Sequence, residues 1–122
     1  SVHRMGGYKI QGRDAKQAET LIADAKRLES AGAFSVLLEG MPNALAAEIT
    51  KTLHIPTIGI GAGPHCDGQV LVLHDLLGLF TRFHPKFVRR YADLTTTAIE
   101  AFARYRSDVL TGKFPTEAEG YE

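Results

Sequence analysis

The sequence of 122 residues is poor in cysteine and has no excess of either charge. Cys66 is its single cysteine, and no CxxC spacing is present. One thiol cannot form a disulfide within the chain, which suits a reducing compartment. Fourteen basic residues balance fourteen acidic ones, so the formal net charge is zero. The balance argues against a general affinity for nucleic acid or anionic membrane, because both depend on a cationic surface.

The sequence also lacks a long hydrophobic run. No apolar stretch approaches the ~18 residues that a membrane helix needs, and the most apolar one, residues 70–80, is interrupted by His74 and Asp75. No secretory signal is recognisable in the first residues. We therefore expect a cytoplasmic protein that binds neither membrane nor nucleic acid.

The first residues are unusual for the start of a domain. Ser1 leads directly into a glycine-rich stretch, and residues 1–13 show no helical periodicity. We expect a loop there, with a short extended piece at residues 8–10, in a chain that begins partway through a fold. Because no linker or internal repeat follows, we expect one partial domain over residues 1–122 and no second domain.

A helix is predicted after Asp14. Asp14 followed three residues later by Gln17 resembles a capping box, in which a side-chain oxygen accepts a hydrogen bond from a free helix N–H. Gly32 stands where a left-handed C-terminal cap would fall. Between them, apolar residues at i, i+3, i+4 and i+7 spacing form one helix face: Ala18, Leu21, Ile22, Ala25 and Leu28.

Two short apolar runs predict strands that are buried on both faces. They cover residues 34–38 and 55–60, and a helix with Pro42 in its first turn separates them. A third run, residues 69–73, fits either a strand or the start of a helix. The buried stripe of the intervening helix consists of Leu45, Ile49 and Leu53.

The end of the chain is predicted to be helical. Asp93 is suited to cap a helix that ends at Gly112, and Phe114-Pro115 follows as a stop. Strands that alternate with crossover helices indicate an α/β fold with a parallel sheet. Two or three strands cannot close a barrel, so we expect a missing partner segment. The apolar stripe of the last helix contains Ala98, Ile99, Phe102, Tyr105 and Val109.

Glu39 is the candidate catalytic residue. It directly follows the first predicted strand, and active sites of α/β folds form at the carboxyl ends of parallel strands. Partial withdrawal from water at that edge would disfavour the charged form of a carboxylate, which suits a general base. The alternative, from position alone, is a glutamate that caps a helix or pairs with an arginine.

A glycine run follows the second predicted strand. Gly59, Gly61 and Gly63 alternate with other residues, as in loops that cradle phosphates, but Pro64 stands where the dinucleotide pattern needs its third glycine. The run fits close approach of the backbone to a ligand, or a tight turn. Gly59 and Gly61 are therefore candidates for lining a substrate pocket.

The histidines and the cysteine give no clear metal or nucleophile motif. His65, Cys66 and Asp67, with His74 nearby, match no zinc spacing, so a turn whose polar groups satisfy backbone atoms is the favoured interpretation. Cys66 lacks a pair that would orient it as a nucleophile. The remaining histidines are interpreted as surface or structural residues: His3, His54 and His84.

Taken in order along the whole chain, several motifs resemble the ketopantoate hydroxymethyltransferase family. They are residues 6–13 (GGYKIQGR), 37–39 (LLE) with Pro42, 55–63 (IPTIGIGAG), 67–72 (DGQVLV), His74-Asp75 with Leu77-Gly78, and Phe114-Pro115. Gly40-Met41 differs from the Cys-Val expected after the glutamate. Residues 117–121 lack the His-Ser pair that is common near the end of the family's sequences.

The resemblance implies the carboxy-terminal half of a (βα)8 TIM-type barrel. The family transfers a hydroxymethyl group from 5,10-methylenetetrahydrofolate to 3-methyl-2-oxobutanoate, which gives 2-dehydropantoate for pantothenate biosynthesis. In the family, Mg²⁺ holds the keto acid and polarises its carbonyl. The glutamate that matches Glu39 is the base that removes a proton to form the enolate.

The resemblance also implies what else the chain needs. The family's metal ligands and substrate lysine lie in the amino-terminal half of the barrel, so no metal ligand is assigned in this chain. That half would be its partner, and the family forms homo-oligomers, often decamers. Two other functions stay open: a related Mg²⁺-dependent barrel lyase or mutase acting on phosphoenolpyruvate-type substrates, and an inactive fragment that acts in oligomer assembly.

Overall fold

The computed structural model describes residues 9–121. The chain divides into two compact units, Ser1–Leu71 and Val72–Glu122, and each is described by itself. Residues 9–13 form a loop without regular structure, as predicted, and no strand forms at residues 9–10, where we expect a short extended piece. The rest of the predicted loop, with the start of the extended piece at residues 8–10, lies outside the described residues. That the chain is one partial domain stays a prediction.

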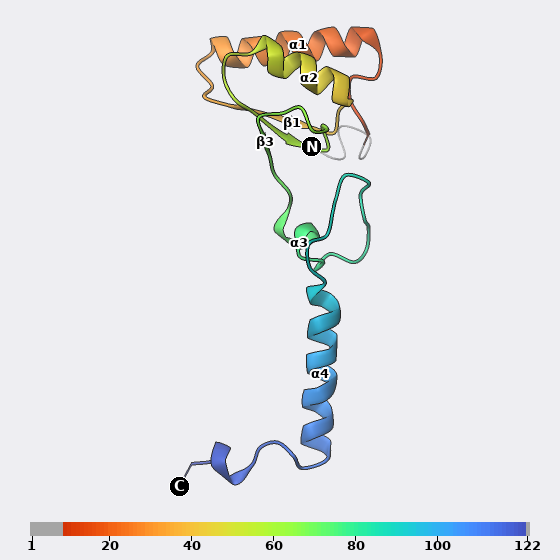
Figure 1. Cartoon of the computed structure of the whole chain (residues 1–122), viewed down its shortest axis with the longest axis vertical. Coiled ribbons are helices and arrows are strands. Elements are labelled where there is room, and N and C mark those ends of the chain that lie inside the picture. The colour runs from red at the N-terminus through yellow and green to blue at the C-terminus, as the bar shows by residue number, and fades with distance from the viewer. Residues whose placement is uncertain (1–8, 122) are drawn as a thin grey trace. The chain divides into compact units, whose positions relative to one another are not determined.

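The first unit is a parallel α/β unit. Its elements in chain order are α1 (Ala15–Ser30), β1 (Val36–Glu39), α2 (Asn43–Thr52), β2 (Thr57–Ile60) and β3 (Gly68–Gln69). The strands form one sheet in the order β1-β2-β3, and both neighbouring pairs are parallel. Figure 1 shows the sheet below α1 and α2. The predicted α/β fold with a parallel sheet is therefore confirmed. The third apolar run contributes the end of β3 and the start of a helix.

The first helix begins at the predicted cap. The Asp14 Oδ1 atom accepts a hydrogen bond from the backbone N–H of Gln17 at 2.9 Å. The Gln17 side chain does not complete a capping box at Asp14; it turns back and accepts a hydrogen bond from the N–H of Gly12. At the other end Gly32, with φ +94°, adopts the left-handed conformation that the sequence indicated.

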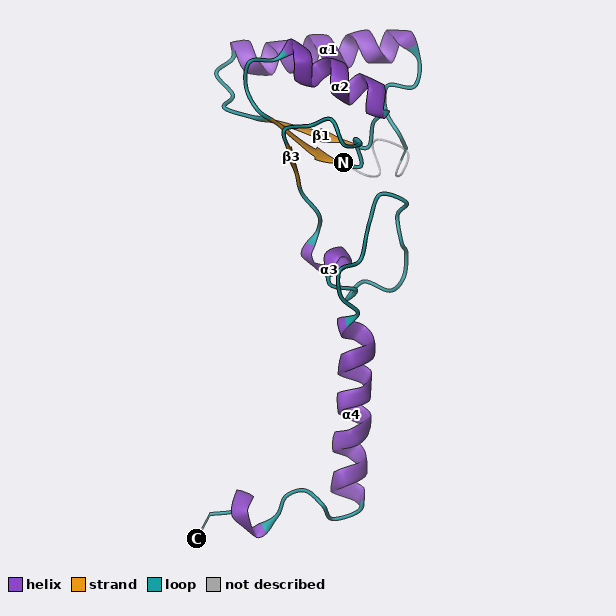
Figure 2. Ribbon diagram, in the orientation of Figure 1, coloured by secondary structure: helices purple, strands orange, loops and turns teal. Residues whose placement is uncertain are grey.

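The strands are not buried on both faces, so this prediction is wrong for the described structure. In β1 Val36 and Leu38 are buried, whereas Leu37 is 58% exposed and Glu39 is exposed. The reason is that α1 and α2 cover the same face of the sheet (Figure 2). Successive side chains of a strand point to opposite faces, so alternate residues remain uncovered.

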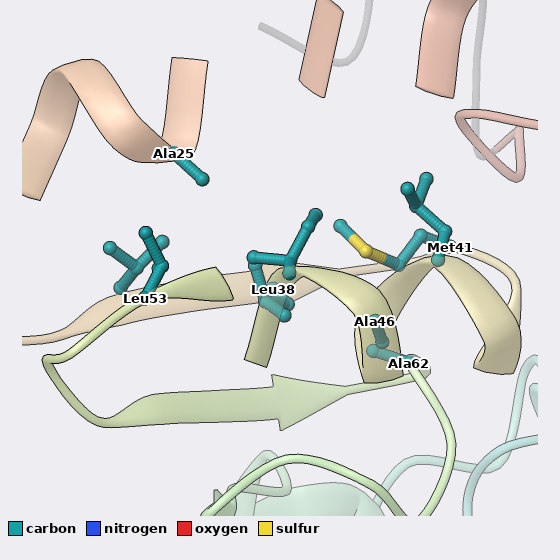
Figure 3. Packing of buried hydrophobic residues seen from close by; sticks show 9 residues of the cluster. Ala25, Leu38, Met41, Ala46, Leu53 and Ala62 are labelled. Carbon is teal, nitrogen blue, oxygen red and sulfur yellow. The ribbon is translucent and has the colours of Figure 1, made fainter. Parts of the chain in front are cut away.

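The core lies between that face of the sheet and the two helices. Ile49, at the centre of α2, is only 1% exposed. Full burial of such a side chain stabilises the fold by about 1.5–3 kcal/mol. Figure 3 shows how these side chains meet. The cluster consists of Ala25, Val36, Leu38, Met41, Leu45, Ala46, Ile49, Leu53 and Ala62.

The connection between β2 and β3 contains no helix. Parallel strands are usually joined by a crossover of a dozen or more residues, but residues 61–67 alone make this one. Gly59 makes room for it, because a Cβ there would lie 2.9 Å from the sulfur of Cys66. The connection therefore folds closely over β2, with Cys66 in the space that a side chain would take.

The second unit is helical. It contains α3 (Leu73–Leu76), α4 (Leu94–Leu110) and a 3-10 helix at Glu117–Glu119. Asp93 caps α4 as predicted, since its Oδ1 atom accepts from the N–H of Thr96 at 3.2 Å. No residue of α4 is buried, so the predicted apolar stripe is present but largely exposed; Ala98 is half-buried, and the ring of Tyr105 lies 5.6 Å from that of Phe114. Across residues 9–121, every helix is too short or too polar to span a membrane.

Candidate active site at the carboxyl ends of the strands

Glu39 is the last residue of β1, at the carboxyl end of the strand, as predicted. Val36 and Leu38 belong to the core beneath the helices, so alternation directs the side chain of Glu39 to the opposite face of the sheet. It is exposed there and makes no hydrogen bond or ion pair with another residue among 9–121. The expected withdrawal from water is therefore not seen, because that face is uncovered.

The turn that follows Glu39 is held by three backbone hydrogen bonds. The N–H of Gly40 donates to the carbonyl of Ile60 at 2.9 Å, and the N–H of Met41 donates to the carbonyl of Gly61 at 3.1 Å. The carbonyl of Gly40 accepts from the N–H of Gln11 at 2.8 Å. Gly40 has φ +56°, which favours glycine. The peptide next to the candidate base is thus fixed from both sides.

The structure brings only one of the two candidate pocket glycines to this turn. Gly61, with φ +62°, lies beside it through its bond to Met41. Gly59 is the register partner of Leu38, so it belongs to the face of the helices rather than that of Glu39. Its missing side chain is explained by the contact with Cys66. A substrate contact at either glycine stays a prediction.

The glycine run is held in place by side chains that the sequence did not single out. The Nε2 atom of Gln69 donates to the carbonyl of Gly63 at 2.9 Å. Gly63 has φ +79°, and a Cβ there would overlap the side chain of Asn43 at the start of α2. A tight turn packed against the chain's own residues therefore accounts for this part of the run.

The segment of His65, Cys66 and Asp67 is a structural turn, as interpreted from the sequence. The Oδ2 atom of Asp67 accepts from the N–H of Thr57 at 2.8 Å and from its hydroxyl group at 3.2 Å. The hydroxyl groups of Thr57 and Thr50 also lie 2.8 Å apart. Thr57 is fully buried. The described residues contain no group of three or more His, Cys, Asp or Glu that could hold a metal ion.

A second carboxylate closes the turn before β2. The Oε1 atom of Glu29 accepts from the backbone N–H of His54 at 2.6 Å and from that of Ile55 at 3.1 Å. The bond from His54 is the main cause that lowers the pKa of Glu29 below its ordinary value of 4.5. His54 therefore has a structural place, through its backbone. Sequence reasoning missed Glu29 because its partners lie far along the chain.

Comparisons with known proteins agree over nearly the whole chain. The model of the family described as ketopantoate hydroxymethyltransferase matches residues 1–117. The 3-methyl-2-oxobutanoate hydroxymethyltransferase of Geotalea daltonii is 60% identical over 121 residues, which are 99% of this chain and 45% of that protein. The protein of the same name from Citrifermentans bemidjiense is 59% identical over 122 residues, 100% of this chain and 46% of that protein. The chain spans less than half the length of these relatives.

Proposed function

Because the chain belongs to the ketopantoate hydroxymethyltransferase family, we propose that it supplies later strands and the last helices of a (βα)8 barrel. The proposed reaction transfers a hydroxymethyl group from 5,10-methylenetetrahydrofolate to 3-methyl-2-oxobutanoate. The relatives' names support the acceptor substrate. The folate donor and the barrel are part of the proposal.

The position of Glu39 is the observation on which the proposed mechanism rests. Its carboxylate stands at the carboxyl edge of a parallel sheet, on the face away from α1 and α2. In a (βα)8 barrel the helices surround the sheet, so this face would be the interior, and the edge would be the mouth where active sites form. An exposed carboxylate in this chain would then face an enclosed site.

In the proposed step, Glu39 acts as a general base on the keto acid. Its carboxylate takes the proton from the carbon next to the ketone, and the electron pair of that C–H bond moves into the carbonyl to give an enolate. Water takes the one-carbon unit from 5,10-methylenetetrahydrofolate as formaldehyde, so that its two bonds to folate nitrogens break and tetrahydrofolate is released. The enolate carbon then bonds to this carbon, and the new alkoxide takes the proton that Glu39 holds. The backbone bonds at Gly40 and Met41 hold the turn that follows the base.

Residues 9–121 by themselves give no metal site. The proposal places the ligands of Mg²⁺ in the part of the relatives that this chain does not cover. Bound there, Mg²⁺ would supply Lewis-acid polarisation of the substrate carbonyl. The proposed role of Glu39 as a base does not require this chain to provide a ligand of the Mg²⁺ ion.

The incomplete sheet supports the need for that part. Strand β1 is an edge strand, and Leu37 is exposed on the uncovered face. An unpaired edge beside an uncovered apolar face needs a further strand and side chains to pack against it. The amino-terminal part of the relatives is the proposed partner.

The experiment is a transferase assay with matched mixtures. The chain alone, the amino-terminal part of the Geotalea daltonii relative alone, and the two together are given 3-methyl-2-oxobutanoate, 5,10-methylenetetrahydrofolate and Mg²⁺. We expect 2-dehydropantoate only from the mixture. Turnover by the chain alone would refute the proposed division of the site. If the folded mixture makes no 2-dehydropantoate but cleaves or rearranges a phosphoenolpyruvate-type substrate, the related lyase or mutase is favoured.

A second role in homo-oligomer assembly is favoured by α4. Phe102 is 72% exposed and Tyr105 is 58% exposed, on a helix without a buried residue. Exposed aromatic side chains along one helix are typical of association surfaces. The decamer that the family resemblance implies belongs to this proposal. Analytical ultracentrifugation of the mixture, with Phe102→Ser as the variant, tests it: the assembly should become smaller.

A further inference from the structure

The N–H of Gly12 depends on one side chain. Gly12 is buried, and its N–H donates to the Oε1 atom of Gln17 at 3.1 Å. Its φ of +73° is one that glycine tolerates, and a Cβ at this position would overlap the side chain of Leu45 and lie 3.0 Å from that of Leu21. The backbone at Gly12 therefore packs closely against α1 and α2, and the hydrogen bond to Gln17 fixes the direction of its N–H.

Gln11, the residue before Gly12, connects this packed backbone to the turn after the candidate base. The N–H of Gln11 donates to the carbonyl of Gly40 at 2.8 Å, and Gly40 directly follows Glu39. On its other side, Gly40 donates to the carbonyl of Ile60. The N–H of Gly12 is thus held by the side chain of Gln17, and the N–H of the preceding residue, Gln11, holds the turn after Glu39.

We propose that Gln17 is a positioning residue for Glu39. Its amide oxygen orients the peptides of residues 11 and 12, so that the N–H of Gln11 stays aimed at the carbonyl of Gly40. The inference rests on the proposed function, because it gives Gln17 a part in the proton abstraction by Glu39. Gln17 touches neither substrate nor base in this role.

Loss of the Gln17 side-chain oxygen should loosen two hydrogen bonds, first that of the Gly12 N–H and then that of the Gln11 N–H to Gly40. Gly12 is buried, although its bond to the exposed Gln17 is only part-buried. An N–H that loses its partner in such a place is costly, so the segment around Gly12 would shift to expose that N–H to water. The bond from Gln11 to Gly40 would then lengthen or break, and the turn after Glu39 would keep only its bonds to the carbonyls of Ile60 and Gly61. Because a misplacement of about 1 Å in a reacting group can cost about 100-fold in rate, a small shift of this turn should lower kcat.

The test uses the chain paired with the amino-terminal part of the Geotalea daltonii relative. Gln17→Ala and Gln17→Met remove the acceptor oxygen, whereas Gln17→Glu keeps one in the same place. Glu19→Ala is the matched control, because its side chain is exposed on the same helix and makes no hydrogen bond with another described residue. Steady-state kinetics and amide hydrogen exchange are measured well below the unfolding temperature.

We expect Gln17→Ala and Gln17→Met to lower kcat roughly ten-fold, with the KM for 3-methyl-2-oxobutanoate little changed. Gln17→Glu should restore kcat, and Glu19→Ala should leave it unchanged. The amide of Gln11, which Gln17 does not touch, should exchange faster in the two variants without the acceptor. A purely structural Gln17 would lower the melting temperature and leave both kcat and the exchange of Gln11 unaltered, which would overturn the proposal.

The two proposals fail in different ways. If the unmutated pair makes no 2-dehydropantoate, the proposed function fails, and the exchange of the Gln11 amide still decides whether Gln17 controls the turn. If the pair is active and neither kcat nor that exchange responds to Gln17→Ala, the proposed function stands and the positioning role is refuted.

Discussion

Glu39 and Ile60 are register partners at the ends of two parallel strands, and both belong to the face of the sheet that α1 and α2 leave uncovered. Partners in a parallel pair share a face, so a site built on Glu39 would have Ile60 as its apolar neighbour. The same edge holds the bond between the carbonyl of Ile60 and Gly40. The candidate base is therefore placed by the strand pairing itself.

The first prediction concerns Glu39→Gln in the chain paired with the amino-terminal part of a relative. Glutamine keeps the shape of the side chain but cannot take a proton, so kcat should fall by about 10²–10⁴-fold, the usual contribution of a general base. Steady-state kinetics with 3-methyl-2-oxobutanoate measure it. The unfolding transition should not change, because the Glu39 side chain makes no hydrogen bond among the described residues.

Glu48→Gln is the control for this prediction. Glu48 is an exposed glutamate of α2, so its substitution makes the same change of charge on an element of the same unit. It should leave kcat unaltered. If the Glu39→Gln protein keeps its activity, Glu39 is not the general base, and catalysis does not explain its position at the end of β1.

The features that could be predicted from the sequence are local. Asp14 with Gln17, and Asp93 with Thr96, cap helices through bonds that span three residues. The apolar runs that gave β1 and β2 are local as well. Short-range chemistry of this kind is readable in one sequence, because the partners stand at fixed offsets.

What the sequence could not give depends on distant partners. Leu37 is as apolar as its buried neighbour Leu38, and only the placement of both helices on one face decides which of the two is covered. The bond from Thr57 to Asp67 crosses ten residues, and that from His54 to Glu29 crosses 25. No periodicity marks such pairs, so the holding of the loops around the candidate site had to come from the structure.

The second prediction concerns the short connection between β2 and β3. Asp67→Ala removes the acceptor of the N–H of Thr57, a fully buried residue. An unsatisfied buried donor costs about 1–3 kcal/mol, so the free energy of unfolding should fall by about that amount. Asp67→Asn keeps one oxygen in place and should cost less. Urea unfolding measures both.

Asp24→Ala is the matched control for Asp67→Ala. Asp24 pairs with Arg27 at 2.9 Å on the exposed surface of α1, and exposed pairs of this kind contribute less than about 1 kcal/mol. If Asp67→Ala destabilises no more than Asp24→Ala, the bond to Thr57 does not hold the connection.

The third prediction concerns pH and Glu29. The pKa of its carboxyl is lowered from 4.5, first by the N–H of His54 and then, against an opposing effect of burial, by the N–H of Ile55. A pKa that folding lowers gives stability that is complete above the unfolded value of 4.5 and is lost as the pH falls through the folded value. The difference in unfolding free energy between the natural chain and Glu29→Gln should therefore shrink below pH 4.5.

Equilibrium unfolding at a series of acidic pH values measures this difference. Glu19→Gln removes the same charge from the same helix without removing a hydrogen bond among the described residues, and it serves as the charge control. A difference for Glu29→Gln that stays constant through the acidic range would mean that the bonds from His54 and Ile55 do not depend on the ionised carboxylate.

The last prediction separates two reasons for a glycine in this unit. Gly32 and Gly63 both have a positive φ, +94° and +79°. A Cβ at Gly32 would meet no atom within 4 Å, whereas one at Gly63 would overlap the side chain of Asn43. Gly32→Ala should therefore cost only the conformational strain of an L-residue, about 1–2 kcal/mol. Gly63→Ala should cost more, because Asn43 must also move.

A double-mutant cycle with Asn43→Ala identifies the extra cost. If it comes from the overlap, truncating Asn43 should recover part of the loss at Gly63 and none at Gly32, since residues in contact couple and separated ones add. Equal losses for the two alanine variants would show that the loop shifts away from Asn43 freely. Because Gln69 also holds the carbonyl of Gly63, a free loop is the less expected result. If the loop does shift freely, the turn beside Glu39 is held in place by the backbone bonds of Gly40 and Met41 alone.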